Sequence, residues 1–165
     1  MNAGGDLTTA TGAAAGRIVA GRHEMAVRVY YEDTDAARMV YHAAYLAFAE
    51  RARTELLRVQ GISQAHLRDA HGLGFAVRRC EVDYRAPARL DDLLLIRTHV
   101  DTHSRVQARL VQHIVHAEDG RAIADLVVTV ACLDTRGRPA RMPAPVTAAL
   151  SAIAATGEMG HTHGR

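Results

Sequence analysis

The spacing of hydrophobic positions changes twice along the chain, and each change predicts a different kind of element. The stretch from His42 to Gln60 places apolar residues at steps of three and four, which is the spacing of one helix face. These apolar residues are Tyr45, Phe48, Ala49, Ala52, Leu56 and Val59. Gly61 follows and supplies a helix stop. The pattern therefore predicts one long helix with a single buried face.

The segments on either side of this helix have the spacing of strands. Met25–Glu32 alternates loosely and is rich in Val and Tyr, and Ser63 can cap a short helix that runs to about Ala70. Further strands are predicted at Phe75–Arg85, Leu93–Val100, Arg105–His116 and Ile123–Leu133. This order favours an α+β fold in which a curled antiparallel sheet wraps around one long central helix.

Turn residues divide the strands and close the folded part. The sequence Glu118-Asp119-Gly120 predicts a hairpin with a type I′ turn, because Asp-Gly supplies the positive φ that this turn requires. Pro139, Pro143 and Pro145 are expected to end the folded region.

The two ends differ in composition from the middle. Residues 1–24 are mostly Gly, Ala and Thr and lack the apolar core of a signal peptide, so we expect a disordered leader that can be removed without loss of stability. Met25 offers a second possible translation start. Residues 25–150 are expected to form a single domain, and residues 151–165 a flexible tail. His161 and His163 in that tail could bind a metal adventitiously, but a solvated tail is the simpler interpretation.

Composition and charge exclude several classes of protein. The chain has 165 residues and a net charge of +2, without a basic block of the kind that nucleic-acid binding requires. No apolar run approaches the ~20 residues of a membrane span. Cys80 and Cys132 do not form a Cys-x-x-Cys motif, so both are expected to be reduced core residues in a reducing compartment.

Two acids one residue apart, Asp33 and Asp35, lie between the first strand and the long helix. Helix capping is the simplest use of such acids, but both lie too far upstream of a helix that starts near His42. A calcium loop would need a third ligand where Ala37 stands, with a glycine after it. A phosphoryl-transfer Asp-x-Asp site needs a parallel sheet, whereas this chain predicts antiparallel hairpins.

A fourth use is an active-site carboxylate that faces the amides of a helix N-terminus. Such amides can hold a developing oxyanion while the acid attacks or activates water. That combination is suited to acyl transfer. The chain has no Gly-x-Ser-x-Gly motif, which argues against a serine α/β-hydrolase.

The stretch VRVYYEDTDAARMVYHAAYLAFAERARTELLR resembles the signature of the 4-hydroxybenzoyl-CoA thioesterase family, and within it the Tol-Pal-associated acyl-CoA thioesterase branch. The Tyr-x-x-Asp-Thr-Asp, Val-Tyr-His-x-x-Tyr and Glu-x-Ala-Arg spacings carry this resemblance. It continues through FAVRRCEVDYRAPARLDDLLLI to about Leu133. The resemblance implies the hotdog fold and a cytoplasmic location. It also implies a homo-oligomer, either a dimer or a dimer of dimers, which is a homotetramer. It implies acyl-CoA or acyl carrier protein thioesters as substrates, with no cofactor, metal or nucleic acid.

The resemblance also assigns roles to individual residues. Asp35 falls on the family's catalytic carboxylate, which acts either as a nucleophile or as a general base on water. The backbone N–H of His42 falls on the position that polarises the thioester carbonyl, a role that does not need the imidazole. Tyr45 and Glu50 fall on positions that line the acyl pocket, although Glu50 could instead pair with a neighbouring Arg. Asp33 is expected to organise the turn.

Two positions depart from the family's usual pattern. Arg38 stands where the family usually has Gly, so the loop either takes another conformation or directs the guanidinium to a ligand phosphate. Arg105 is the nearest basic candidate for the CoA phosphates, and a solvent-facing strand Arg is the alternative. The competing function is a non-catalytic acyl-binding hotdog subunit, a scaffold beside the Tol-Pal envelope machinery, which would not require Asp35.

Overall fold

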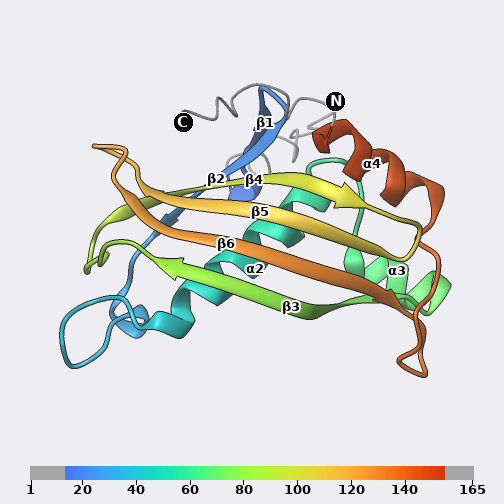
Figure 1. Ribbon diagram of the computed structural model, residues 1–165, viewed down its shortest axis with the longest axis horizontal. Coiled ribbons are helices and arrows are strands. Elements are labelled where there is room, and N and C mark those ends of the chain that lie inside the picture. Colours follow the sequence, from blue (N-terminus) through green and yellow to red (C-terminus); the bar gives the residue numbers. More distant parts are fainter. Residues whose placement is uncertain (1–13, 155–165) are drawn as a thin grey trace, which may run out of the picture.

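The computed structural model describes residues 14–154 as a six-stranded antiparallel sheet with a long helix across one face (Figure 1). The elements are β1 (Arg17–Val19), β2 (Arg22–Arg28), the 3-10 turn η1 (Tyr31–Asp33), α2 (His42–Arg58), α3 (Gln64–His71), β3 (Gly74–Tyr84), β4 (Leu93–His103), β5 (Gln107–His116), β6 (Ala122–Leu133) and α4 (Ala144–Ala154). The strand order is β1-β2-β4-β5-β6-β3. This is the hotdog arrangement that the sequence predicted.

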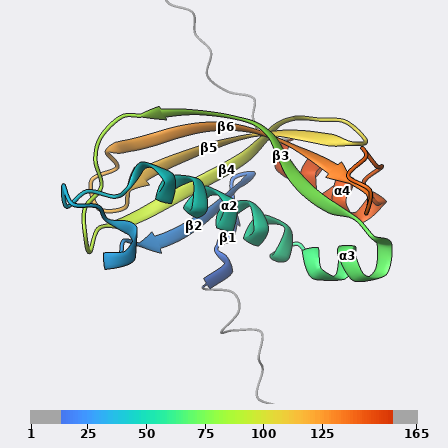
Figure 2. The same ribbon diagram turned by 90° about the horizontal axis from the view of Figure 1, so that it is seen from below.

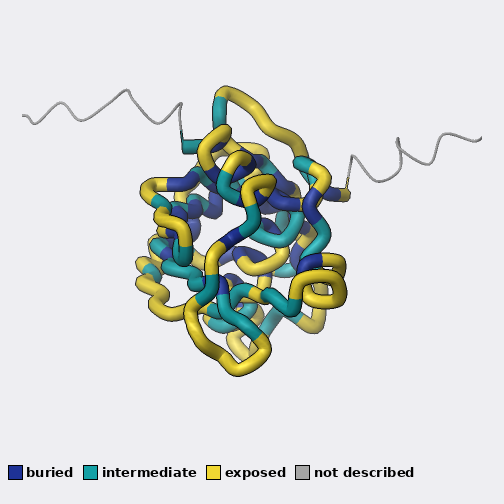
Figure 3. The backbone as a smooth tube through the Cα atoms, turned by 90° about the vertical axis from the view of Figure 1, so that its right-hand side faces the viewer, coloured by how far each residue is buried: buried dark blue, intermediate teal, exposed yellow. Residues whose placement is uncertain are grey.

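The core lies between α2 and the concave face of the sheet, where the buried segments of the chain gather (Figure 3). Phe48, Ala49 and Ala52 of α2 are completely buried, as are Leu94 and Ile96 of β4. Alternate residues of each central strand point toward the helix, because side chains in a strand alternate between the two faces of the sheet. The small alanine side chains let α2 approach the sheet closely, which explains why the predicted apolar stripe faces inward.

One edge of the sheet is formed by β3, which is 11 residues long and largely exposed. Its side chains that face α2 include Val77 and Tyr84, which are 52% and 50% exposed. Cys80 shares this face and is also exposed, so its prediction as a core residue is wrong. No described element lies beyond β3 to cover it. Cys132, in contrast, is buried as predicted.

The N-terminal segment differs from the disordered leader that the sequence predicted for residues 1–24. From residue 14 onward it is ordered: β1 pairs with the start of β2, and His23 is completely buried. The His23 Nε2–H donates to the Ala15 carbonyl at 2.7 Å. Gly16 has φ of +75°, and a Cβ there would lie 2.2 Å from the Glu24 carbonyl oxygen. Specific backbone packing therefore orders a segment that is poor in large side chains.

The C-terminal end also extends further than the sequence predicted. The prolines do not close the folded part, because α4 begins at Ala144 and continues through Ala154, past the expected boundary at residue 150. Val146, Leu150 and Ile153 of α4 are buried in a second apolar cluster with Leu56 and Leu57 of α2. The remaining tail, with His161 and His163, lies outside the described residues.

Smaller differences concern turns. In the hairpin after β5, Gly120 has φ of +71° while Asp119 does not have a positive φ, so the turn is not type I′. The Gly120 N–H donates to the His116 carbonyl at 2.9 Å, which closes a wider loop. Arg105 precedes β5 instead of lying in it. None of the described helices is long and apolar enough to cross a membrane.

Candidate active site

The segment between β2 and α2 is held by Asp33. Its Oδ2 accepts the Tyr30 N–H at 2.8 Å, and its carbonyl oxygen accepts the Tyr41 N–H at 2.8 Å. The first bond closes η1, and the second ties this turn to the residue before α2. Asp33 therefore organises the turn, as the sequence predicted.

Asp35 lies in a tight loop beside this turn. Its Oδ1 accepts the Ala37 N–H at 2.8 Å, and its own N–H donates to the Met39 carbonyl at 2.9 Å. Thr34 and Val40 form a β-bridge across the base of the loop. The Asp35 side chain is exposed, and its Oδ2 has no hydrogen-bond partner among residues 14–154. One carboxylate oxygen therefore fixes the loop while the other is available to a ligand.

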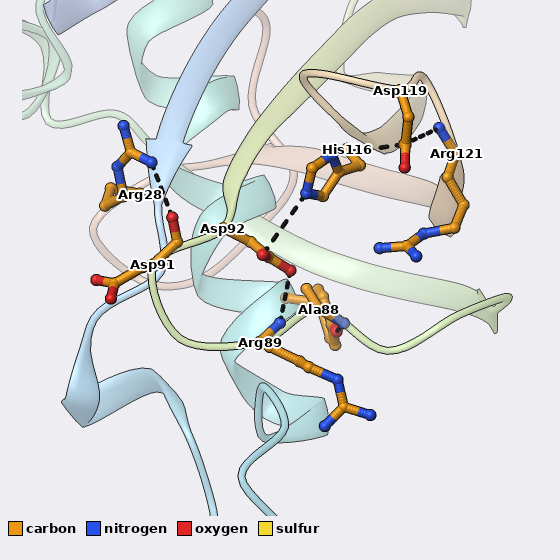
Figure 4. Close-up of polar contacts among 9 residues, drawn as sticks. Arg28, Ala88, Arg89, Asp91, Asp92, His116, Asp119 and Arg121 are labelled. Carbon is orange, nitrogen blue, oxygen red and sulfur yellow. Dashed lines mark hydrogen bonds and ion pairs between the residues drawn. The ribbon is translucent and has the colours of Figure 1, made fainter.

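The loop rests on a second turn, residues 86–92, whose own polar contacts are drawn in Figure 4. The Val40 N–H donates to the Ala88 carbonyl at 2.8 Å. Asp92 Oδ2 accepts the Arg89 N–H at 2.9 Å, and His116 Nε2 lies 3.6 Å from Asp92 Oδ1. The guanidinium of Arg28 donates to the Asp91 carbonyl at 2.8 Å. Strands β2, β4 and β5 thus all help to fix the turn on which the Asp35 loop rests.

The N-terminus of α2 follows this loop directly. Tyr41 is the residue before the helix, and neither a capping side chain nor an acid occupies the first turn. Ala44 N–H donates to the Tyr41 carbonyl, while the N–H groups of His42 and Ala43 have no acceptor within the described residues. Amides at a helix N-terminus carry partial positive charge. They can bind an anion or a carbonyl oxygen that gains negative charge.

Two tyrosines support this helix end. The Tyr84 hydroxyl of β3 donates to the His42 carbonyl at 2.9 Å. Tyr45, which the resemblance places on the acyl pocket, is buried, and its hydroxyl accepts the Ala88 N–H at 3.1 Å. Burial raises the pKa of the Tyr45 phenol, so the group stays protonated. Within one subunit, Tyr45 therefore supports the 86–92 turn. Tyr84 contacts the N-terminus of α2, and the sequence analysis did not identify it as a candidate site residue.

Glu50 lies on the same helix as His42 but far from its N-terminus. The eight residue steps from His42 to Glu50 span about 12 Å along the helix axis. Glu50 does not pair with an Arg in the described part of the chain; its Oε1 accepts the Thr54 hydroxyl at 3.0 Å. Gln64 of α3 in turn donates to the Thr54 oxygen at 3.1 Å. Glu50 lines a cavity between α2, α3 and β3 together with Arg53, Thr54 and Gln64.

Arg53 and Gln112 form a polar contact that the sequence did not predict. Arg53 Nη1 donates to Gln112 Oε1 at 2.9 Å, and the amide of Gln112 donates to Ala49 O and Thr98 Oγ1, each at 3.0 Å. Gln112 is fully buried on β5, at an inward position of the strand pattern where the sequence has a polar residue. Burial lowers the pKa of the Arg53 guanidinium. This network fixes the middle of α2 to the sheet.

The two arginines proposed for CoA phosphates belong to segments far apart: the loop between η1 and α2, which contains Arg38, and the turn between β4 and β5, which contains Arg105, lie at opposite ends of the sheet (Figure 1, Figure 2). Arg38 is in the Asp35 loop, is exposed, and has φ of +60°. The loop therefore keeps the left-handed conformation that suits Gly, and the alternative of a different conformation is wrong. Arg105 follows β4, whose 11 residues span about 36 Å from the 86–92 turn. In a single subunit, one CoA ligand therefore cannot place its phosphates on Arg105 and its thioester on Asp35.

Comparisons with known proteins bear on the family and the fold of this chain. Residues 29–150 match the family model described as the thioesterase-like superfamily. The Escherichia coli O6:H1 protein named acyl-CoA thioester hydrolase YbgC is 46% identical over 123 residues, which cover 74% of this chain and 90% of that protein. The long-chain acyl-CoA thioesterase FadM of Escherichia coli K12 is 31% identical over 71% of this chain and 86% of its own length. The crystal structure of a probable thioesterase from Bartonella henselae has a TM-score of 0.69 at 35% identity and covers 74% of this chain and 99% of its own.

Proposed function

Because the chain belongs to the thioesterase-like superfamily, we propose that it is an acyl-CoA thioester hydrolase with Asp35 as its catalytic carboxylate. The observation that carries this proposal is the position of Asp35, with one oxygen available, in the loop that leads into the uncapped N-terminus of α2. The names of the relatives support the reaction class. The site residues are supported by the local geometry and by the family resemblance of the loop.

The chemistry follows from these two groups. The thioester carbonyl oxygen accepts the N–H of His42, which stabilises the negative charge that forms when the carbonyl carbon is attacked. In one route Asp35 attacks this carbon, the CoA thiolate leaves, and water hydrolyses the resulting anhydride. In the other route Asp35 takes a proton from water, which attacks the carbon directly. Both routes yield a carboxylic acid and free CoA.

An Asp35→Asn variant tests the assignment. The amide retains an oxygen that can accept the Ala37 N–H, so the loop is expected to keep its shape. Hydrolysis should fall by at least ~100-fold, the lower end for loss of a positioned acid–base group. Release of thiol from a panel of acetyl-, hydroxybenzoyl- and palmitoyl-CoA and acyl carrier protein thioesters measures it. Hydrolysis by the variant at the wild-type rate would show that another group is catalytic.

We further propose that the protein is a cytoplasmic homo-oligomer, either a dimer or a dimer of dimers. The exposed face of β3 carries Val77 and Tyr84, and Leu46 of α2 is 40% exposed. A long edge strand with exposed apolar side chains favours pairing with a second copy. A lone species of 17.8 kDa in sedimentation at micromolar concentration would contradict this.

The alternative function, a non-catalytic acyl-binding scaffold beside the Tol-Pal machinery, differs in what it requires of Asp35. A scaffold needs the apolar cavity but not a carboxylate at the helix N-terminus. Acyl-CoA binding without thiol release by the wild-type protein would favour the scaffold. Tight binding together with release that depends on Asp35 would favour the enzyme.

A further inference from the structure

His116, the last residue of β5, lies with its imidazole between two carboxylates (Figure 4). Its Nε2 is 3.6 Å from Asp92 Oδ1, and its Nδ1 is 3.4 Å from Asp119 Oδ1. Only 12% of the side chain is exposed. Both are ion-pair contacts and not hydrogen bonds, and Nδ1 is buried without a hydrogen-bond partner among residues 14–154. Each ring nitrogen therefore faces a group that, when ionised, can only accept a hydrogen bond.

The charged groups around this imidazole come from the turn and the hairpin that enclose it. Asp92 belongs to the 86–92 turn, and Asp119 and Arg121 belong to the hairpin between β5 and β6 (Figure 4). The Arg121 N–H donates to Asp119 Oδ1 at 2.9 Å, and this bond is the main cause that lowers the pKa of the Asp119 carboxyl. From α2, the Tyr45 phenol is within reach of the charge of Asp92 and stays protonated because it is buried. Two carboxylates and one guanidinium are therefore the charges that these elements place around the imidazole.

Asp92 connects the imidazole to the Asp35 loop through backbone groups. Its Oδ2 accepts the Arg89 N–H at 2.9 Å, and Arg89 forms an antiparallel bridge with Met39. The Met39 carbonyl in turn accepts the Asp35 N–H at 2.9 Å. A displacement of the Asp92 side chain is therefore transmitted to the backbone of Asp35.

The two protonation states of His116 differ in what they offer the carboxylates. A protonated imidazole donates from both ring nitrogens, whereas a neutral imidazole donates from one and presents a lone pair at the other. The neutral ring leaves one carboxylate facing that lone pair, and it also loses the attraction between opposite charges. Because the imidazole is largely buried, salt screens this attraction less than it screens a surface pair. The protonated form therefore holds Asp92 more firmly than the neutral form does.

We propose that His116 is a positioning residue for the reaction, whose protonated form holds Asp92 and through it keeps the Asp35 loop in its catalytic position. The inference rests on the proposed thioesterase function. His116 does not touch the substrate, so its loss should lower kcat and leave KM within about twofold of the wild type. The loss in kcat can be large, since a catalytic group displaced by 1 Å can cost about 100-fold in rate.

Two substitutions separate the charge of His116 from the shape of the turn. His116→Gln keeps an amide that can donate to one carboxylate but never carries a charge. Asp92→Asn keeps an oxygen that can accept the Arg89 N–H but removes the negative charge that faces the imidazole. His99→Gln is the matched control, because His99 is a half-buried histidine of β4 that lies about 23 Å along the strand from Asp92.

The test measures kcat and KM from pH 5.5 to 8.5 with the acyl-CoA that the wild type hydrolyses fastest, because histidine side chains usually change charge in this range. At pH 5.5, kcat of His116→Gln and of Asp92→Asn should be at least about fivefold below the wild type. This deficit should narrow to less than about twofold at pH 8.5, where the wild-type imidazole is neutral as well. The ratio of wild type to variant cancels the titration of Asp35, which all these proteins share. The double variant should lose no more than either single variant, and His99→Gln should follow the wild type.

Amide hydrogen exchange gives a second readout that does not depend on hydrolysis. At pH 6 the Asp35 N–H should exchange faster in His116→Gln and Asp92→Asn than in the wild type, because its bond to the Met39 carbonyl belongs to the transmitted series of contacts. Amides in the middle of β6 should exchange at the wild-type rate in both variants.

Each contrary outcome overturns a defined part of the reasoning. A kcat ratio that stays constant from pH 5.5 to 8.5 would overturn the role of the protonated imidazole and leave the proposed function intact. Additive losses in the double variant would show that His116 does not act through Asp92. If circular dichroism shows that His116→Gln is unfolded, Asp92→Asn carries the test alone, and a wild-type pH profile in that variant overturns the inference. If the wild type hydrolyses no thioester, the proposed function fails, while the exchange rates still decide whether His116 holds the loop.

Discussion

Replacement of Arg38 by different residues distinguishes the effect of its backbone strain on stability from the effect of its positive charge on ligand binding. Arg38 has φ of +60°, a conformation that costs a residue with a Cβ about 1–2 kcal/mol. Arg38→Gly removes that cost, whereas Arg38→Ala retains it. Both variants remove the guanidinium, so their comparison isolates the backbone term.

The expected difference in stability follows from two opposing terms. Relative to alanine, glycine at this position raises the free energy of unfolding by about 1–2 kcal/mol because it relieves the strain of the folded loop. It also lowers the free energy of unfolding by about 0.4–1 kcal/mol because its unfolded chain is more flexible. Arg38→Gly should therefore be more stable than Arg38→Ala by about 0.5–1 kcal/mol. In a protein of this size such a difference raises the melting temperature by about 1–4 °C.

The assays are chemical denaturation for stability and steady-state kinetics for the charge. If Arg38 contacts a CoA phosphate, both variants should raise KM for acyl-CoA equally, while KM for acyl-pantetheine, which lacks the nucleotide phosphates, should not change. Arg38→Lys keeps a positive charge and should retain most of the affinity. A Gly variant that is less stable than the Ala variant would refute the backbone argument, and an unchanged KM in both would refute the phosphate contact.

Three further predictions concern the N-terminal hairpin. Removal of residues 1–24 should lower the melting temperature by several degrees because it removes β1 and the first residues of β2, whereas removal of residues 1–13 keeps every contact described above and serves as the control. Gly16→Ala should lower the free energy of unfolding in urea, because its Cβ would lie 2.2 Å from a carbonyl oxygen; equal stability would contradict this close approach. Burial lowers the pKa of His23 below its unfolded value of 6.5, so the native state binds fewer protons than the unfolded state and stability should fall as the pH drops below about 6.5. The fall can reach about 1.4 kcal/mol per pH unit, and a His23→Gln variant with an equally steep fall would contradict the assignment.

The pH effect has a structural basis beyond burial. His23 Nε2–H donates to Ala15, and Nδ1 is buried without a hydrogen-bond partner in the described residues. Protonation would place a second N–H at Nδ1 with no acceptor, which adds to the cost of desolvating the charge. His99, outside the hairpin, also has a pKa lowered by burial, so the His23→Gln variant should retain part of the pH dependence.

The central part of the fold could be predicted because one core imposes two different periodicities. The helix stripe that contains Phe48 and the strand positions that contain Ile96 and Ile114 face the same interior. Ser63 accepts the His66 N–H, so the predicted cap is also confirmed. These signals are local in the sequence and do not depend on where other elements lie.

The two end segments were missed because their order depends on distant partners. Strand β1 has three residues, and its stability comes from β2 and from packing of Ala15 and Gly16. Helix α4 did have a local signal, since Val146, Ala149, Leu150 and Ile153 follow one another at steps of three, one and three after Pro145. An alanine-rich composition hid this apolar face, which is buried against the end of the sheet.

The candidate site was predictable in its sequence-local part. Asp35 and His42 are seven positions apart, so one short motif contains both, and the Thr34–Val40 bridge closes the loop between them just before the helix. The relation of this centre to Glu50 and Arg105 depends on the length of α2 and of β4, which the motif does not contain. Tyr84 and Gln112 come from strands far along the chain, and only the antiparallel pairing of the sheet brings them to α2.

The unequal edges of the sheet have a consequence for the size of any assembly built from it. On one side, β1 covers the start of β2 and leaves only Met25–Arg28 of that strand unpaired with it. On the other side, none of the strands within residues 14–154 pairs with the outer edge of β3, which is 11 residues long. A sheet with two long open edges can add copies without end and grow into a fibre. When a sheet has one such edge, two copies that pair across a two-fold axis use both long edges. Strand pairing therefore stops at two copies.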